Sequence, residues 1–180
     1  MSVEKACAAV RRGGLIAYPT EGVFGFGCDP ACLPAVERII ALKGRDAAKG
    51  LIIIASAQSQ LDNYMETLAP ETQSRIDATW PGPVTWIVPA RTGVNPLLTG
   101  QRPTLAVRVS AHPVVREICD SLGHGLISTS ANRSGDAPLR TAAQVRQMFS
   151  SDVDVIVEGA TGERDKPTPI FDAQTLKQLR

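Results

Sequence analysis

The basic residues of this sequence are concentrated in segments that are predicted to be loops. Lys43, Arg45 and Lys49 fall close together after a predicted helix. Arg108 differs from the others because it lies inside a strand pattern, residues 105–109, where an arginine is expected to be paired or to face a cleft. The remaining loop-associated cations are Arg102, Arg133, Arg140, Arg164 and Lys166. Any one of them alone is typical of a solvated surface.

A run of hydroxyl and amide side chains ends a predicted buried strand at Ser128-Thr129-Ser130-Ala131-Asn132. Hydroxyls and backbone N–H groups at a strand end can hold phosphate or carboxylate oxygens, although capping and turn formation explain them equally well. Cationic loops and hydroxyl groups together predict a polyanionic ligand such as a nucleotide.

Several other chemistries have little support. The two histidines, His112 before a proline and His124 between glycines, are interpreted as a helix cap and an exposed turn residue, so Ser-His-Asp or Cys-His catalysis is not indicated. The glycines after the first predicted strand are spaced GxxGxG, unlike a dinucleotide-binding fingerprint. Cys28 and Cys32 lack a second ligand pair at zinc-site spacing, and four cysteines are too few for a disulfide framework.

Composition sets the broad class. The 180 residues carry 19 Lys and Arg against 18 Asp and Glu, for a net charge of +1, and 43% are hydrophobic. This balance excludes a generally basic protein but not a local cationic site. The N-terminus lacks the apolar core of a secretory signal, and the longest apolar run, residues 51–55, is far shorter than the roughly 18 residues that span a membrane. We therefore expect a cytoplasmic protein with no membrane segment, whose acids, such as Glu37, Glu66, Glu71 and Asp77, lie away from the cationic loops.

Helical and strand patterns alternate along the chain. Helices are predicted from Ser2, as N-cap, to Gly13 and over 31–42, 71–79, 112–122 and 141–149, the last with a capping box formed by Thr141 and Gln144. Strands are predicted over 15–18, 51–54, 84–88, 105–109, 126–129, 153–157 and 170–171. This order predicts one α/β domain over residues 1–180 with a mixed, twisted sheet. The connections 19–30, 43–50, 132–140 and 159–169 are longer than usual, so the chemistry is expected there.

Five segments, in the same order, resemble the YrdC-like family of threonylcarbamoyl-AMP synthases. They are Tyr18-Pro19-Thr20-Glu21, Lys43-Gly44-Arg45 with Lys49-Gly50-Leu51, Trp80-Pro81-Gly82-Pro83-Val84-Thr85, Leu105-Ala106-Val107-Arg108, and Ser128 to Gly135. The sequence departs from the family pattern at Gly22, where many members have threonine, and at Pro167-Thr168-Pro169-Ile170. The glycine at position 22 resembles the short, stand-alone bacterial branch.

The resemblance implies a twisted sheet with flanking helices around a large, positively lined cleft. It also implies a nucleotidyltransferase that joins L-threonine, bicarbonate and ATP into threonylcarbamoyl-AMP with release of pyrophosphate, with Mg²⁺ on the triphosphate. A partner transferase complex would then modify adenosine 37 of ANN-decoding tRNAs, to give t6A, and binding of tRNA or double-stranded RNA is also implied as a possibility. The family's catalytic tetrad corresponds to Lys43, Arg45, Ser130 and Asn132. Substrate-binding roles are implied for Thr20, Lys49, Arg108, Ser128 and Arg164.

Two alternatives remain open from the sequence. The first is an RNA-binding factor in ribosome or tRNA maturation without catalysis, which the cationic loops fit but which the aromatic content of 4% supports poorly. The second is a carbamoyl-transfer domain like that of hydrogenase maturation proteins, whose additional zinc-finger and acylphosphatase modules have no counterpart here.

Overall fold

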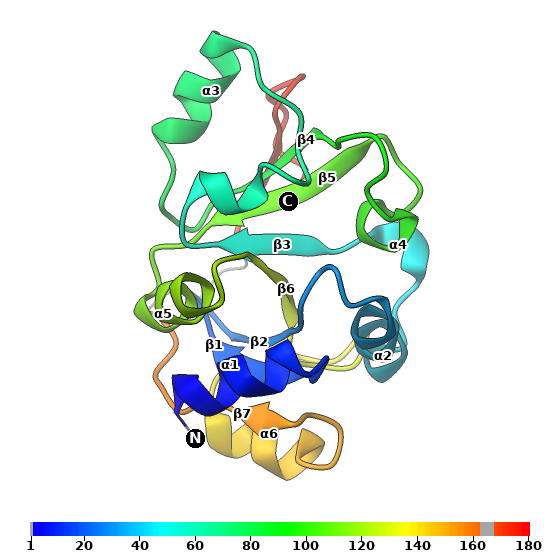
Figure 1. Ribbon diagram of the computed structural model, residues 1–180, viewed down its shortest axis with the longest axis vertical. Coiled ribbons are helices and arrows are strands. Elements are labelled where there is room, and N and C mark those ends of the chain that lie inside the picture. The colour runs from blue at the N-terminus through cyan, green and yellow to red at the C-terminus, as the bar shows by residue number, and fades with distance from the viewer. Residues whose placement is uncertain (1, 163–167) are drawn as a thin grey trace.

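A mixed β-sheet runs through the length of the molecule, with α3 at one end and α6 at the other (Figure 1). The computed structural model describes residues 2–162 and 168–180. Within them the strand order is β7-β1-β2-β6-β3-β5-β4-β8. The strands are β1 (Ile16–Pro19), β2 (Phe24–Gly27), β3 (Ile52–Ala55), β4 (Thr85–Pro89), β5 (Thr104–Val109), β6 (Leu126–Ser130), β7 (Val155–Ile156) and β8 (Ile170–Asp172). The pairs β1/β7, β3/β5 and β4/β8 are parallel, and the other neighbouring pairs are antiparallel.

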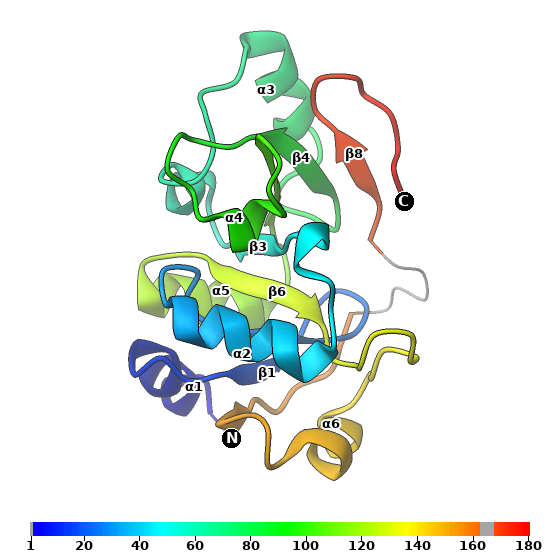
Figure 2. The same cartoon turned by 90° about the vertical axis from the view of Figure 1, so that its right-hand side faces the viewer.

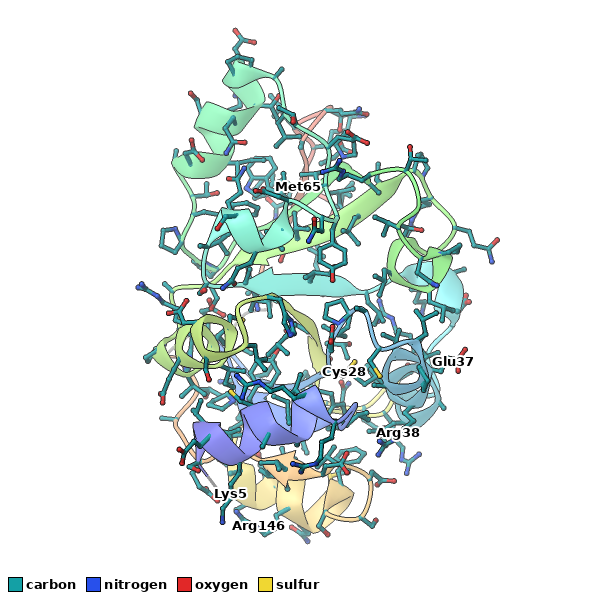
Figure 3. All side chains as sticks on the ribbon, viewed as in Figure 1. Lys5, Cys28, Glu37, Arg38, Met65 and Arg146 are labelled. Carbon is teal, nitrogen blue, oxygen red and sulfur yellow. The ribbon has the colours of Figure 1, made fainter. Side chains whose placement is uncertain are left out.

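Six α-helices and two short 3₁₀ helices occur in the described residues. They are α1 (Val3–Arg11), α2 (Leu33–Lys43), α3 (Pro70–Asp77), α4 (Pro96–Thr99), α5 (Pro113–Leu122), α6 (Ala142–Phe149), η1 (Ala47–Lys49) and η2 (Gln58–Leu61). Figure 3 shows Glu37 and Arg38 projecting outward from α2, whereas Cys28 lies inside and is fully buried. The prediction of a single α/β domain with a mixed sheet and flanking helices is confirmed.

The two faces of the sheet pack in two separate apolar layers. Ile53 belongs to the larger layer, which includes Val36 and Ile39 of α2, while Ile54 belongs to the smaller layer formed with α1 and α5. Consecutive strand residues face opposite sides, so a strand such as β3 must be apolar throughout to fill both layers. The prediction that this segment is buried on both faces is confirmed for Ile53 and Ile54, whereas Ile52 is only partly buried.

The segment 19–30 is not a continuous loop, because it contains β2. Phe24 and Phe26 alternate with Gly25 and Gly27, so both phenylalanines enter the larger core layer and both glycines face the other side. A Cβ added to Gly27 would lie 2.6 Å from the Tyr18 ring, so the glycine makes room for this buried aromatic residue. Glycine is a poor strand former, which is why the pattern predicts a loop.

Local helix signals gave mixed results. The capping box of α6 is present, with both the Thr141 and the Gln144 side chain bonded as predicted. Ser2 occupies the N-cap of α1 as predicted, but its side chain makes no capping hydrogen bond. Lys43, expected in a loop, is the last residue of α2, because the helix ends only at Gly44, which adopts the left-handed conformation.

The segment that carries η1 is held against α4 by a close backbone contact. Leu51 donates its N–H to the Leu98 carbonyl at 2.9 Å, and a Cβ at Gly100 would lie 2.4 Å from the Ala48 carbonyl oxygen. The φ angle of Gly100 is 64°, in the left-handed region that favours glycine. This contact fixes where the cationic segment after α2 lies.

Gly100→Ala is therefore expected to lower the free energy of unfolding by more than the roughly 1 kcal/mol typical of strain at a left-handed residue. Gly44→Ala is the matched control, because Gly44 also ends a helix, with φ 56°, but has open space around its Cβ position. Urea unfolding of both variants measures the difference. Equal losses would show that the contact with Ala48 does not constrain the fold.

Candidate functional site

A cleft of about 640 Å³ lies over the part of one sheet face that α1 and α5 leave uncovered. On β6, Leu126 packs in the layer formed with these helices, and Ser128 and Ser130, which follow at alternate positions on the same face, line the cleft. On β3, Ile54 packs under the helices and Ile52 lines the cleft in the same way. On this face of the sheet, one part of β6 and of β3 therefore packs in the apolar core, and the other part of each strand lines the cleft.

Residues that lie opposite one another on neighbouring strands form the floor of the cleft. Ile52 lies opposite Ser128 on one side and Ala106 on the other, and Ala106 lies opposite Ile87, which pairs with Asp172. All five residues line the cleft. The floor is therefore mainly apolar at its centre, with hydroxyl groups of β6 at one edge.

Charge in the cleft wall is predominantly positive. Six of the described lining residues are basic and one is acidic. The basic residues are Arg45, Lys49, Arg102, Arg108, Arg140 and Arg180, and the acidic residue is Asp172. Such a wall attracts an anion with several charges.

Lys43 lies behind this wall rather than in it. Its side chain is buried, and Nζ donates to the carbonyl oxygens of Ser130 at 2.5 Å and Asn132 at 2.9 Å and to Asn132 Oδ1 at 3.0 Å. Burial lowers its pKa to about 8, with a smaller contribution from the Arg45 charge. No carboxylate of the described residues forms an ion pair with it. The Lys43 cluster, meaning Lys43, Ser130 and Asn132, joins the end of α2 to the end of β6.

Further hydrogen bonds extend this cluster into the loop after β6. Ser130 Oγ donates to Asn132 Oδ1 at 2.6 Å, and Asn132 Nδ2 donates to the Asp136 carbonyl at 2.7 Å. Ser134 donates its backbone N–H to the Lys43 carbonyl at 2.8 Å. Because Asn132 Oδ1 receives the Ser130 proton, the Ser130 oxygen, which lines the cleft, is left as an acceptor.

Arg45 is held by its own loop. Its Nε and Nη2 both donate to the Gly50 carbonyl, at 3.2 and 3.0 Å. Burial lowers the pKa of this guanidinium, and the nearby charges of Arg180 and Arg102 lower it further. Arg102 is held similarly, since its Nη2 donates to the Lys49 carbonyl at 2.9 Å. Backbone carbonyls fix these side chains without cancelling their charge.

Arg108 reaches the cleft from the centre of the sheet and is only 4% exposed. Its Nη2 lies 3.5 Å from Glu21 Oε2, and Ser110 Oγ donates to Glu21 Oε1 at 2.5 Å. Arg108 Nε and Glu21 Oε2 are both buried without a hydrogen-bond partner. A buried donor of this kind is costly unless a ligand satisfies it.

Thr20 and Ser128 lie together at the hydroxyl edge. Thr20 Oγ1 donates to the Val23 carbonyl at 2.8 Å, and both side chains line the cleft. A Cβ at Gly25 would lie 3.5 Å from Thr20 Cγ2 and 3.6 Å from Ser128 Oγ, so the absence of a side chain there keeps this edge open.

The structure brings most of the predicted site residues to one place. Those that line the cleft are Arg45, Ser130, Thr20, Lys49, Arg108 and Ser128, and those that lie behind its wall are Lys43 and Asn132. Arg164 lies outside the described residues. The sequence reasoning missed Arg180 and Asp172, since only the pairing of β8 with β4 brings this part of the chain to the cleft.

The two histidines do not line the cleft. His112, which is buried, stands at the N-cap of α5 as predicted, but its side chain makes no capping hydrogen bond. Its Nε2 lies 3.1 Å from the Ala160 carbonyl instead. The His124 Nδ1 lies 2.8 Å from the Gly125 carbonyl, and the residue is partly buried rather than exposed.

Neither a metal centre nor a membrane helix is found in the part of the chain that the structure describes. No group of three or more His, Cys, Asp or Glu side chains is placed there to hold a metal ion. No described helix has the length and apolar character needed to cross a membrane.

The fold and the cleft define an α/β protein with a cationic binding site, and comparison with known proteins gives the family. The family model Sua5_yciO_yrdC, described as "Telomere recombination", matches residues 8–180. The chain therefore belongs to the Sua5/YciO/YrdC family, as the resemblance predicted.

Named relatives cover nearly the whole chain. It is 53% identical over 178 residues to a threonylcarbamoyl-AMP synthase of Nitrosococcus oceani, covering 99% of this chain and 96% of that protein. It is 45% identical over 181 residues to a threonylcarbamoyl-AMP synthase of Vibrio vulnificus, covering 99% and 97%.

Solved structures agree with this assignment. P. abyssi Sua5 complexed with L-threonine is similar with a TM-score of 0.88 and 30% identity, over 94% of this chain and 50% of that one. E. coli YciO is similar with a TM-score of 0.83 and 25% identity, over 94% and 82%. This chain thus spans about half the length of the Sua5 chain.

The burial of Lys43 predicts a pH-dependent stability. Because its pKa in the folded protein, about 8, is below the ordinary value, the unfolded chain binds more protons between these two values, and the free energy of unfolding rises with pH. The substitution Lys43→Met removes the titrating group, so the free energy of unfolding of the variant lacks this rise with pH. The stability of the native protein relative to the variant should grow by about 2 kcal/mol between pH 8 and pH 10, as urea titrations at each pH would measure. A difference that is constant or shrinks with pH would contradict the burial of a charged Lys43.

Proposed function

We propose that this protein is a threonylcarbamoyl-AMP synthase and, by reaction class, a nucleotidyltransferase. It joins L-threonine, bicarbonate and ATP and releases pyrophosphate. The observation that carries the proposal is the cleft wall, where the described lining residues include six basic side chains and one acidic side chain, with hydroxyl groups at one edge of the floor. The names of the relatives from N. oceani and V. vulnificus and the threonine complex of P. abyssi Sua5 support the same reaction.

The chemistry needs alignment and charge neutralisation more than a strong base. Threonine and bicarbonate first combine, with loss of water, into a carbamate. A carbamate oxygen then forms a bond to the α-phosphorus of ATP, and the bond from that phosphorus to the bridging oxygen of pyrophosphate breaks. Negative charge builds up on the phosphate oxygens during this step, so fixed cations lower the barrier.

The described residues suit these roles. Arg45 and Arg108 line the cleft with guanidinium groups that can neutralise phosphate charge. The Ser130 oxygen can accept the carbamate N–H, and the Ser128 and Thr20 hydroxyls lie at the same edge to contact carbamate or threonine oxygens. Lys49 is assigned to the nucleotide because it lines the same wall. Arg164 keeps the substrate-binding role that the resemblance implies.

Lys43 and Asn132 act in this proposal through the position of Ser130. Lys43 Nζ already makes three hydrogen bonds to Ser130 and Asn132 oxygens, and both residues are buried behind the wall. They are therefore positioning residues, and the contact with phosphate falls to Arg45 and Arg108.

Magnesium is proposed to arrive with the nucleotide. The cleft offers one described carboxylate, Asp172, whose Oδ1 already accepts the Gln174 and Thr175 N–H groups at 2.9 and 2.7 Å. These residues do not form a dedicated Mg²⁺ site, so phosphates and water would be its main ligands.

The product then serves a partner transferase complex that modifies tRNA in the cytoplasm, and tRNA or double-stranded RNA binding remains part of the proposal. An RNA-binding role without catalysis has weaker support. Phe26 packs against Phe149 at 5.0 Å, and Trp86 against Phe171 at 5.4 Å, so these rings are engaged with one another in or beside the core instead of forming a base-stacking platform.

Pyrophosphate release from ATP should require L-threonine and bicarbonate together. A coupled pyrophosphate assay with each co-substrate omitted in turn measures this requirement. Release that continues at the full rate without either co-substrate would overturn the synthase proposal, as would salt-sensitive RNA binding with no ATP turnover at all.

Arg45→Ala should lower the rate of pyrophosphate release at least about tenfold, equivalent to ~1.4 kcal/mol at the barrier, because it removes a fixed charge from the phosphates. Arg133→Ala is a suitable control, since Arg133 is exposed and its guanidinium lies over the Phe149 ring at 5.9 Å instead of lining the cleft. A rate for Arg45→Ala equal to that of the control would remove Arg45 from the site.

A further inference from the structure

A buried carboxylate, that of Glu21, lies directly behind the cleft in the turn between β1 and β2. In Figure 2 this turn, in blue, lies beside the segment that follows β7, in orange, and Gly162 of that segment donates its N–H to the Thr20 carbonyl at 3.0 Å. Thr20 and Gly22 line the cleft, whereas Glu21 between them does not and is only 9% exposed. The proposed reaction gives Thr20 a role but leaves this buried charge without one.

The Glu21 carboxylate is oriented from one side by Ser110. Ser110 Oγ accepts the His112 N–H at 3.1 Å and donates its own proton to Glu21 Oε1 at 2.5 Å. Ser110 is itself fixed, because its N–H donates to the Ala55 carbonyl of β3 at 2.9 Å. A hydroxyl has one proton, and here that proton is committed to Glu21. The carboxylate is therefore held with Oε2 toward Arg108.

Arg108 contacts Glu21 through an ion pair without a hydrogen bond. Its Nη2 lies 3.5 Å from Glu21 Oε2, which is longer than a hydrogen bond. Arg108 Nε and Glu21 Oε2 are both buried without a hydrogen-bond partner. Arg45 and Arg102, by contrast, each donate two hydrogen bonds to backbone carbonyls. Glu21 thus attracts the Arg108 guanidinium but does not take up its N–H groups.

The distance between the two charges suits a cation that must bind a ligand. A guanidinium as buried as that of Arg108 needs a counter-charge, because the removal of an isolated ion from water is costly. A carboxylate in full hydrogen-bonded contact would compete with phosphate oxygens for the same N–H groups. The looser contact with Glu21 compensates the charge and orients the group, while Arg108 Nε still lacks an acceptor.

We propose that Glu21 is a positioning residue for Arg108: held by Ser110, its carboxylate sets the orientation in which the guanidinium stabilises phosphate charge during the reaction. This inference rests on the proposed function, because the phosphate is that of ATP. The competing account is that Glu21 and Ser110 only stabilise the turn after β1. In that case the loss of Glu21 lowers activity whichever residue occupies position 108.

The test is a double-mutant cycle on pyrophosphate release that depends on threonine and bicarbonate. Glu21→Gln keeps the shape of the side chain and an acceptor for Ser110 but removes the charge, and it should lower kcat/KM for ATP at least about tenfold. In an Arg108→Gln background the same substitution should change kcat/KM by less than about twofold, because the residue through which it acts is gone. This background is expected to keep measurable activity, since Arg45 still lines the cleft.

Glu37→Gln is the matched control, because it removes the same charge from an exposed position on α2 (Figure 3). Its kcat/KM should stay within about twofold of the parent value in both backgrounds. A native kcat/KM in Glu21→Gln would overturn the inference and leave the synthase proposal intact. Equal losses with and without Arg108 would assign Glu21 to the stability of the turn and also overturn the inference. A native protein without this pyrophosphate release would overturn both proposals.

Thermal unfolding tests the ion pair independently of activity. The double variant Glu21→Gln/Arg108→Gln should have a higher Tm than Glu21→Gln, because it leaves no buried guanidinium without its counter-charge. A double variant with an equal or lower Tm would contradict the pairing. If Glu21→Gln does not fold, Ser110→Ala takes its place in the cycle. It should lower kcat/KM at least about threefold with Arg108 present and less than about twofold without it, and equal losses would refute the inference.

Discussion

The Lys43 ammonium group is buried where α2 and β6 end, and the shape of the cleft depends on its hydrogen bonds. Removing such a charge from water costs several kcal/mol, and three hydrogen bonds to oxygens, at about 1.5–3 kcal/mol each, offset part of this cost. The lowered pKa of Lys43 reflects the part that remains. The Phe26 ring, 5.9 Å from Nζ, adds a favourable contact. Because these hydrogen bonds join the end of α2 to the loop after β6, they hold that loop in place and fix Ser130 at the cleft edge.

Other cations around the cleft are also held by hydrogen bonds to backbone carbonyl oxygens. The guanidinium groups of Arg45, Arg102 and Arg180 are each held by backbone carbonyls, whereas Arg108 is paired with a carboxylate, that of Glu21. A carbonyl fixes a cation without neutralising it, whereas a carboxylate would compete with a phosphate for the same N–H groups. The near-zero net charge of the chain therefore does not reveal the local excess of positive charge in the cleft. Acids such as Glu37, Glu71 and Asp77 are exposed on helices elsewhere. The hydrogen bonds to backbone carbonyls keep these cations in place and leave them charged, so that they can bind a polyanion.

Much of the fold was predictable because its signals are local. The apolar run of β3 and the capping box at Thr141 and Gln144 depend only on neighbouring residues. The burial of Lys43 was not predictable, since a lysine before a helix-ending glycine has the usual pattern of an exposed C-terminus. Strand β2 was hidden by its glycines, which are required by contacts with Tyr18 and with the open edge at Thr20 and Ser128. Arg180 reaches the cleft only through the pairing of β8 with β4, which no short window of sequence contains.

A crystal structure of the protein with L-threonine and a non-hydrolysable ATP analogue tests most directly how the cleft works. We predict that phosphate oxygens accept hydrogen bonds from the guanidinium groups of Arg45 and Arg108, while Lys43 Nζ stays on the oxygens of Ser130 and Asn132. Phosphates bound directly to Lys43 Nζ, with its hydrogen bonds to Ser130 and Asn132 broken, would contradict this account, and so would a nucleotide bound outside the cleft.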